Sequence, residues 1–202
     1  MTEPDVAAAA ALLRKHGIRF VVIGGQAIAQ KAATTTHDVD VMVATSDFAT
    51  TIARLRIDRE LAFDWEDEQL ARFRIRASGG VPLDVINASA FAGERSGETF
   101  FTFLAKDGST ETDGIPYALP EVVWYTRLLT KRWKAYAEKI VTNVIDGVAP
   151  GRLGKVVEIA RRFGTETTIR TRVAYVREEL ARPDVESPLK LSLIHISEPT
   201  RP

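Results

Sequence analysis

The sequence predicts an α/β fold, in which a mixed sheet flanked by helices is followed by a C-terminal helical bundle. Up to about residue 118, short runs rich in β-branched residues alternate with helix-forming segments, the order expected when helices cover a sheet. Beyond that point apolar residues recur at helical spacing in 121–133, 135–146, 152–163 and 168–182. We therefore expect a core over 1–118, a helical region over 119–183 and a tail over 184–202.

The first part of the core alternates helix, strand and helix. A helix is expected from about Glu3 to His16, with Gly17 ending it. The run IRFVVIG (18–24) is apolar and β-branched, which predicts a buried strand, and GQAIAQKAA (25–33) has helix-forming composition. The chain thus passes from a strand through a glycine turn into a helix.

The next strand is expected in THDVDVMV (36–43), because its residues alternate in character. The valines at 39, 41 and 43 point one way, while Asp38, Asp40 and Met42 point the other. One face should therefore be buried and the other should present two carboxylates. Thr45 or Ser46 is expected to cap the helix SDFATTIARLR (46–56) that follows.

A hairpin and further strands complete the expected core. LAFDWED (61–67) and LARFRIRASG (70–79) alternate as a hairpin pair, and the Gly79-Gly80 turn leads into the strand VPLDVINA (81–88). Between Glu94 and Asp113 the composition indicates one more strand, at the apolar FFTFLA (100–105), with loops around it. Pro120 then stands at the start of the first C-terminal helix.

The composition is that of a globular chain without disulfides. Hydrophobic residues make up 45% of the 202 residues, charged residues make up 27%, and cysteine is absent, which excludes a disulfide framework and thiolate metal ligands. The N-terminal stretch has an acidic start, the reverse of a secretory signal, and no apolar window reaches the roughly 18 residues of a membrane span. We expect a cytoplasmic protein without a membrane segment.

The charge is unevenly distributed, although the formal net charge is zero. Residues 1–120 hold 12 Lys and Arg against 17 Asp and Glu, and residues 121–182 hold 13 against 7. This distribution suits a carboxylate metal site that faces a basic surface for phosphates. Solvated helix faces alone would give a similar asymmetry.

The last twelve residues, LSLIHISEPTRP (191–202), share no periodicity with the preceding chain. They resemble the in-frame translation of a transposase sequencing adapter, which implies that the native sequence is truncated near Lys190 and that His195 is excluded from any functional role. A natural disordered tail is the alternative.

Three features carry the expected chemistry. Gly24-Gly25, between a strand and a helix, lets backbone N–H groups approach phosphates, although a tight turn would also need glycine. Twelve residues separate Gly25 from Asp38. Asp38 and Asp40, at i and i+2 on one strand, offer two adjacent carboxylates to Mg²⁺. The plainer explanation of this pair is a strand edge that faces solvent. Asp84, on a later strand, can complete a metal site or accept a proton.

This ordered set resembles the DNA polymerase beta-like nucleotidyltransferase superfamily, and within it the AbiEii-type toxins and minimal nucleotidyltransferases. The resemblance covers Ile18 to about Asp146 and includes Thr36, two positions before the first aspartate. It implies a nucleotidyltransferase-type fold and transfer of a nucleoside monophosphate from an NTP such as ATP to a hydroxyl. The catalytic residues that bind two Mg²⁺ ions would be Asp38, Asp40 and Asp84, and the nucleotide would contact Gly24, Gly25, Gln26 and Thr36.

The resemblance continues into the helical region with departures. The family's Pro-Glu helix start and its two later basic positions correspond to Pro120-Glu121, Arg127-Leu128 and Lys134-Ala135. Arg127 and Lys134 are therefore candidates for holding phosphate oxygens. Ala135 stands where the family has Asp, and Thr34 stands where many members have Arg.

Other polar and aromatic residues have plainer explanations beside a functional one. His37 precedes Asp38, but a lone histidine at a strand start is more often a surface residue. Among the helices, aromatic residues interleaved with basic ones suit either base stacking or a core stripe, and alternating arginines on one strand suit phosphate, an acidic neighbour or solvent. These two sets are Trp124, Trp133 and Tyr136, and Arg72, Arg74 and Arg76.

The sequence therefore favours a Mg²⁺-dependent nucleotidyltransferase whose acceptor is RNA such as tRNA, a partner protein, or a small aminoglycoside-like molecule. A component of a toxin–antitoxin system, with a cognate antitoxin as partner, is the expectation for the first two acceptors. The alternative is a non-catalytic nucleotide-binding or interaction module with the same fold, which the two departures favour.

Overall fold

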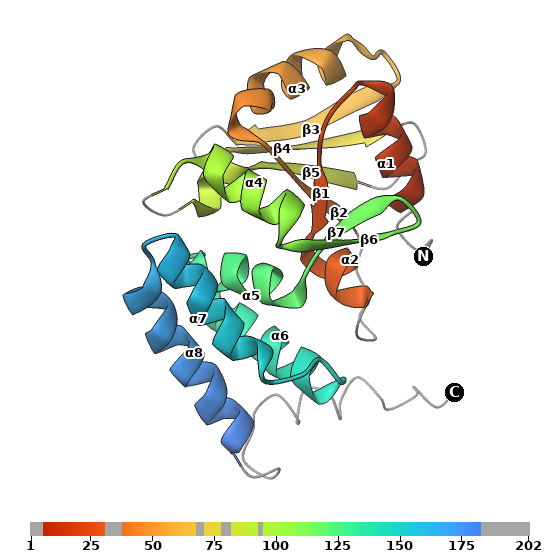
Figure 1. Ribbon diagram of the computed structural model, residues 1–202. Helices are drawn as coiled ribbons and strands as arrows, with labels where there is room; N and C mark the ends of the chain where they lie inside the picture. Colours follow the sequence, from red (N-terminus) through yellow and green to blue (C-terminus); the bar gives the residue numbers. More distant parts are fainter. Residues whose placement is uncertain (1–5, 31–37, 68–70, 78–81, 93–94, 183–202) are drawn as a thin grey trace, which may run out of the picture.

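A seven-stranded mixed sheet lies at the centre of the computed structural model, which describes residues 6–30, 38–67, 71–77, 82–92 and 95–182 (Figure 1). The strands lie in the order β3-β4-β5-β2-β1-β7-β6. The pairs β2–β5 and β1–β7 are parallel, and the other neighbours are antiparallel. Their bounds are β1 (Val21–Ile23), β2 (Val39–Val43), β3 (Leu61–Asp67), β4 (Arg72–Ala77), β5 (Pro82–Asn87), β6 (Ser109–Thr112) and β7 (Ile115–Ala118).

Helices flank this sheet, and four more follow it in the chain. The first group is α1 (Val6–Lys15), α2 (Gly24–Ala29), α3 (Thr45–Ile57), the 3-10 helix η1 (Ala88–Phe91) and α4 (Gly97–Lys106). The second group is α5 (Pro120–Leu129), α6 (Trp133–Ile145), α7 (Arg152–Arg162) and α8 (Glu166–Ala181). In Figure 1 the second group gathers below the sheet, and α3 lies at the opposite end of the molecule. The expected α/β fold, a mixed sheet flanked by helices, is confirmed.

The two faces of β4 carry different side chains, as strand alternation requires. Phe73 and Ile75 are fully buried, and the Phe73 ring lies 5.6 Å from the rings of both Phe48 on α3 and Phe63 on β3. The arginines at 72, 74 and 76 therefore project from the other face of the strand. That face is the one on which the carboxylates of β2 and β5 lie.

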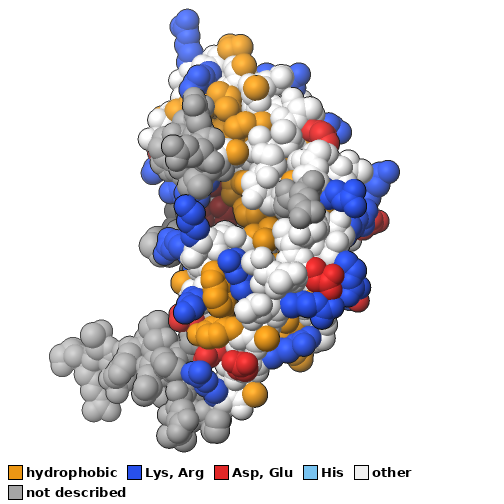
Figure 2. Space-filling model, turned by 90° about the vertical axis from the view of Figure 1, so that its left-hand side faces the viewer, with side chains coloured by type: hydrophobic (Ala, Val, Ile, Leu, Met, Phe, Trp, Pro, Cys, Tyr) orange, Lys and Arg blue, Asp and Glu red, His pale blue; other side chains and the backbone are white. Residues whose placement is uncertain are grey.

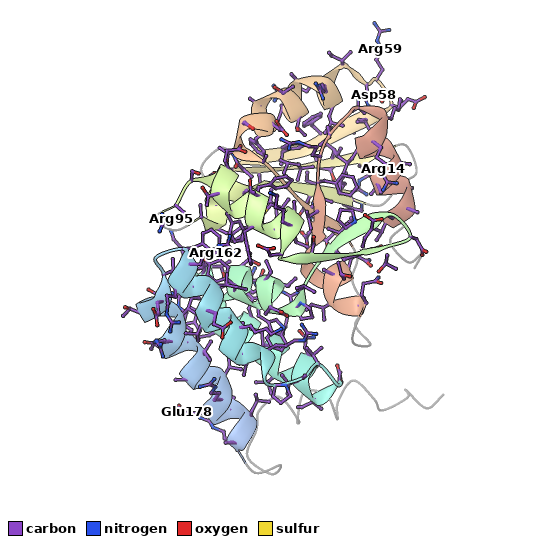
Figure 3. The ribbon with its side chains drawn as sticks, viewed as in Figure 1. Arg14, Asp58, Arg59, Arg95, Arg162 and Glu178 are labelled. Carbon is purple, nitrogen blue, oxygen red and sulfur yellow. The ribbon has the colours of Figure 1, made fainter. Side chains whose placement is uncertain are left out.

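An aromatic cluster joins α4 to the C-terminal helices. The Phe163 ring, fully buried at the end of α7, lies 4.9 Å from Phe100 and 6.3 Å from Tyr125. Arg162 lies between α7 and α4, as Figure 3 shows, with its guanidinium 4.7 Å from the centre of the Phe103 ring. Large buried aromatic surfaces of this kind dominate packing energies, so these ring contacts hold α7 against α4.

The apolar run at 100–105, which the sequence predicts as a strand, belongs instead to the helix α4. Ser96 precedes α4, and its hydroxyl accepts a hydrogen bond from the Thr99 backbone N–H, which is a helix cap. Phe100, Phe103 and Leu104 are buried at i, i+3 and i+4, so the apolar run has helical rather than strand periodicity. The strands here are the short hairpin β6–β7 that follows the helix.

Several boundaries differ from the expectation in smaller ways. The helix α3 begins after Ala44, which has no side-chain cap, so the capping role expected of Thr45 or Ser46 is wrong. Met42 is fully buried, so β2 is covered on both faces rather than on one. The helix expected over 121–133 ends at Leu129, because Thr130 is extended, and α6 begins at Trp133. The Gly79-Gly80 turn and the tail over 184–202 lie outside the described residues.

None of the helices in the described ranges combines the length and the apolar composition that crossing a membrane requires.

Candidate functional site

Strand register places the key side chains in one row across four neighbouring strands. Arg74 on β4 pairs with Asp84 on β5, Asp84 pairs with Asp40 on β2, and Asp40 pairs with Ile23 on β1. Because paired residues on adjacent strands lie about 5 Å apart and point to the same face, the row sets Arg74 beside the carboxylates. The residue after Ile23 is Gly24, so the glycine turn begins where this row ends.

Asp38, Asp40 and Asp84 form a compact acidic cluster. One carboxylate oxygen of each residue lies within 4.8 Å of the others. Asp84 is buried, with 5% of its surface exposed, while Asp38 and Asp40 are partly exposed. Three hard oxygen donors at this separation match the ligand type and size of a Mg²⁺ site, in which the metal–oxygen distance is about 2.0–2.1 Å.

Gly24 is the residue that the geometry of this cluster requires at its position. Its φ is +70°, in the left-handed region that favours glycine. A Cβ atom on Gly24 would lie 2.0 Å from Oδ2 of Asp40, which is far inside van der Waals contact. The turn after β1 therefore lies so close to the Asp40 carboxylate that no side chain fits at position 24.

Among the three carboxyl groups, Asp40 has a pKa raised by burial and by its two neighbours. Burial, followed by the charges of Asp38 and Asp84, raises the pKa of Asp40 from 3.8 to about 7, although Arg127 and Arg74 act in the opposite direction. Like charges this close disfavour one another's ionisation unless a cation compensates. A divalent cation is the compensation that the donor set fits.

Arg74 supplies part of this compensation from within the chain. Its Nε donates to Oδ1 of Asp84 at 2.5 Å, and its Nη2 donates to Oδ2 of Asp84 at 2.8 Å. The same Nη2 also donates to Oδ2 of Asp38 at 3.0 Å. A forked guanidinium–carboxylate pair is the strongest geometry available to these groups, and it raises the pKa of Arg74.

The cluster lies at the base of a cleft between the sheet and helices α5 and α6. The cleft has a volume of about 760 Å³. Its acidic and basic lining residues are Asp38, Asp40, Asp84, Asp146, Arg72, Arg74, Arg127, Arg132 and Lys139. Figure 2 shows a small recessed acidic area near the middle of one face, with Lys and Arg side chains close to it. Carboxylates at the base and cations around them are the arrangement expected for a metal and a polyanionic ligand.

The wall opposite the carboxylates comes from α5 and one face of α6. Tyr136, Lys139, Asn143 and Asp146 follow one another at helical spacing and all line the cleft. The Arg127 guanidinium lies 5.7 Å from the centre of the Tyr136 ring, and Lys139 Nζ lies 5.8 Å from it. Burial lowers the pKa of Arg127, while the nearby Asp40 acts in the opposite direction. This wall therefore presents two cations held around one aromatic ring.

The expected site residues divide into three groups. The cleft is lined by Gly24, Gly25, Asp38, Asp40, Asp84 and Arg127. Gln26 is buried in α2 and does not belong to the lining, and Lys134 is exposed, with its Nζ 5.9 Å from the Trp133 ring. Thr34, Thr36 and His37 lie outside the described residues.

Some lining residues were not singled out from the sequence. Arg132 and Lys139 lie close to Lys134 in the chain, but only the helical phase of α6 distinguishes the side chains that face the cleft. Arg74 was noted as one of three alternating arginines, and the pairing register of β4 with β5 selects it. Of the aromatic residues, Trp124 is fully buried, so its expected core role is confirmed, whereas Tyr136 lines the cleft.

No protein-family model and no curated protein sequence matches the chain. Among solved structures, it is similar to the antibiotic-resistance factor ANT(2'')-Ia, with a TM-score of 0.43 and 15% identity over 96% of each chain. It is also similar to an antigenic nucleotidyltransferase-like protein from Paracoccidioides brasiliensis, with a TM-score of 0.44 and 16% identity over 92% of this chain and 90% of the other. For JHP933 from Helicobacter pylori, the TM-score is 0.35 and the identity 9%, over 98% of this chain and 100% of the other.

The mixed sheet flanked by helices is the architecture that the sequence motif implies. Similarity at this level assigns neither an activity nor a substrate to this chain.

Proposed function

We propose that the chain is a Mg²⁺-dependent nucleotidyltransferase that moves a nucleoside monophosphate from an NTP to a hydroxyl group. The observation that carries this proposal is the row of Asp40 and Asp84 on paired strands, with Asp38 beside them, all within 4.8 Å at the base of a cleft. Carboxylates gathered in this way are costly for the fold and suit a site that binds a hard cation.

The metal would be held by Asp38, Asp40 and Asp84. Bound there, it would supply Lewis-acid stabilisation of the charge that develops on the transferring phosphate. The acceptor oxygen bonds to the α-phosphorus, the bond from that phosphorus to the β-phosphate oxygen breaks, and pyrophosphate leaves. The proton of the acceptor hydroxyl passes to a carboxylate of the cluster. The chain's own contribution is to hold these three carboxylates together at the base of the cleft.

The triphosphate would lie between the glycine turn and the basic wall of the cleft. Gly24 and Gly25 line the cleft beside the carboxylates, where the absence of side chains admits a phosphate close to the backbone. Arg127 faces them from α5, with Arg132 and Lys139 nearby. We retain Gln26, Thr36 and Lys134 as predictions of the sequence resemblance, with Lys139 as the more direct candidate for a phosphate contact from α6.

The acceptor is proposed to be RNA, such as tRNA, or a partner protein. Among the described lining residues five are Arg or Lys and four are Asp, and three of those four would be taken up by the metal. A polycationic drug would meet a wall of like charge, whereas a polyanion would not. A role as the toxin of a toxin–antitoxin pair follows for such acceptors, and we propose the cytoplasm, where NTPs and Mg²⁺ are at hand, as the location.

The test is pyrophosphate release with Mg²⁺ and each NTP over a set of RNA, protein and small-molecule acceptors. Activity should fall at least about a hundredfold in Asp38→Ala and Asp40→Ala, the scale on which single electrostatic groups contribute to catalysis. Asp64→Ala is the matched control, because Asp64 lies on β3 of the same sheet, where it pairs with Arg76 outside the cleft lining. Equal activity in all variants would contradict the proposal.

A second function, non-catalytic NTP binding, is favoured by Ala135 and Thr34 standing at family Asp and Arg positions. Calorimetry separates the two functions: saturable NTP binding together with no product on any acceptor supports the non-catalytic module. Growth arrest on expression, relieved by a neighbouring gene, supports a toxin, whereas survival on a drug supports a resistance enzyme.

A further inference from the structure

Arg74 places a positive charge between two carboxylates of the acidic cluster. Its guanidinium reaches both oxygens of Asp84 and one oxygen of Asp38, at 2.5, 2.8 and 3.0 Å. The Arg74 side chain is 27% exposed and that of Asp84 is 7% exposed, so the contact is largely shielded from water. A cation in this setting acts on two of the three carboxylates at once.

The register of the sheet fixes this arrangement. Arg74 and Asp84 are directly paired across the antiparallel β4–β5 ladder, and neighbouring pairs hold Phe73 opposite Val85 and Ile75 opposite Leu83. Phe73, Ile75 and Val85 are fully buried on the other face. Removing Arg74 from Asp84 therefore requires the side chain alone to rotate, because the strand itself is held by its core face.

The neighbouring arginine shows that Arg74 differs from an ordinary surface ion pair. Arg76 lies two residues along on the same face and reaches Asp64 through Nε and Nη2, at 3.3 and 2.9 Å. The Arg76 side chain is 50% exposed, and it contacts one oxygen of one carboxylate. Exposed pairs of this kind contribute about 0–1 kcal/mol. The partly buried fork of Arg74, which grips both oxygens of Asp84, is a fixed charge of the site.

We propose that Arg74 replaces the second metal ion, so that Asp38, Asp40 and Asp84 together bind one divalent cation while Arg74 holds Asp84 in place. This inference rests on the proposed metal site. Three carboxylates, one guanidinium and one divalent cation sum to zero charge, whereas a second divalent cation would have to displace Arg74 or share Asp84 with it. Arg74 is thus a positioning residue that keeps Asp84 fixed and sets the metal stoichiometry.

The test is the stoichiometry of Mn²⁺ binding, measured by electron paramagnetic resonance on the full chain without nucleotide. We expect one Mn²⁺ per wild-type chain, lost in Asp40→Ala. In Arg74→Gln, which frees Asp84 and Asp38, we expect two. Arg74→Lys keeps the positive charge and should bind one, and Arg76→Gln, the matched control, should also bind one.

Each outcome tests either the role of Arg74 or the proposed metal site. Two ions on the wild-type chain, or one ion on a folded Arg74→Gln variant, overturns the role of Arg74 and leaves the proposed function standing. No bound Mn²⁺ on the wild-type chain overturns both. If Arg74→Gln does not fold, as circular dichroism would show, the wild-type count together with Arg74→Lys decides, because two ions on either one contradicts the inference.

Discussion

Replacing Asp40 by Asn should stabilise the metal-free protein, and the stabilisation should depend on pH. Burial and the neighbouring carboxylates raise the pKa of Asp40 from 3.8 to about 7. A carboxyl group whose pKa is raised on folding binds its proton more tightly in the folded state, so its ionisation costs stability. The cost is absent below about pH 4, grows between pH 4 and 7, and is complete above that range.

The magnitude follows from that difference in pKa. At about 1.4 kcal/mol for each tenfold change, ionised Asp40 costs up to about 4 kcal/mol in the free energy of unfolding. Asn has nearly the same shape and no charge, so Asp40→Asn should recover much of this amount at pH 8 and little at pH 4. Urea denaturation in the presence of EDTA, at both pH values, measures the difference.

Asp64→Asn is the control for this experiment, because it removes an aspartate from the same sheet but breaks the ion pair with Arg76. It should not stabilise the protein. The reasoning is refuted if Asp40→Asn is no more stable than the wild type at pH 8, or if the gain is equal at pH 4 and pH 8. Added Mg²⁺ should raise the melting temperature of the wild type and leave that of Asp40→Asn nearly unchanged.

Three further predictions concern single positions. Gly24 and Gly114 both have a left-handed backbone, with φ of +70° and +74°, so Gly24→Ala and Gly114→Ala should each lower the free energy of unfolding by about 1–2 kcal/mol. Only Gly24→Ala should also abolish Mn²⁺ binding, because its Cβ would lie 2.0 Å from the Asp40 carboxylate, whereas the nearest atom to a Cβ at Gly114 is 3.7 Å away. Equal Mn²⁺ binding in both variants would be inconsistent with this. Arg152→Ala should lower the free energy of unfolding, measured with denaturant, by about 3 kcal/mol, because the buried Glu121 carboxylate loses its ion pair with Arg152 at 2.5 Å. Lys155 lies 3.7 Å from Glu121 and is 61% exposed, so Lys155→Ala should lower it by less than about 1 kcal/mol. Similar losses would argue against the Arg152 contact. Hydrogen bonds from Lys15, the Glu60 backbone and His16 lower the pKa of Asp58 to about 2, so this group stabilises the fold above about pH 4 and the contribution disappears as pH falls towards 2. Asp58→Asn should therefore lower the melting temperature at pH 7 and have little effect at pH 2, and a drop of equal size at both pH values would contradict the assignment.

Local sequence patterns were sufficient for most of the fold. Alternation of apolar and polar residues predicted β2, the β3–β4 hairpin and β5. The failure at 100–105 has a physical cause: a short apolar run has no decisive period, and the signal that decides, the Ser96 cap, lies before it. The division of the chain at residue 118 stays a prediction.

The candidate site was predictable where its residues follow one another in the chain. Asp38 and Asp40 share a face of one strand, and Gly24 follows the strand before it, so their order and spacing in the sequence were enough to predict these site residues. Arg74 and Lys139 could not be selected in this way. Which of three alternating arginines meets Asp84 depends on strand register, and which basic residue of α6 faces the cleft depends on how that helix packs.

Register links the function of this site to its stability. A slip of one residue between β4 and β5 would place Phe73 or Ile75 opposite Asp84 and turn the arginines towards the core, so the buried face of β4 protects the Arg74 contact. The same row brings Asp40 against Asp84 and makes Asp40 unfavourable to ionise, a cost that Arg74 reduces and a bound cation would remove. Arg74→Gln should therefore destabilise the metal-free protein most above pH 7, where Asp40 is ionised. Added Mn²⁺ should restore a larger share of the lost stability in Arg74→Gln than in Arg76→Gln. Equal recovery in the two variants would mean that Arg74 is an ordinary ion pair.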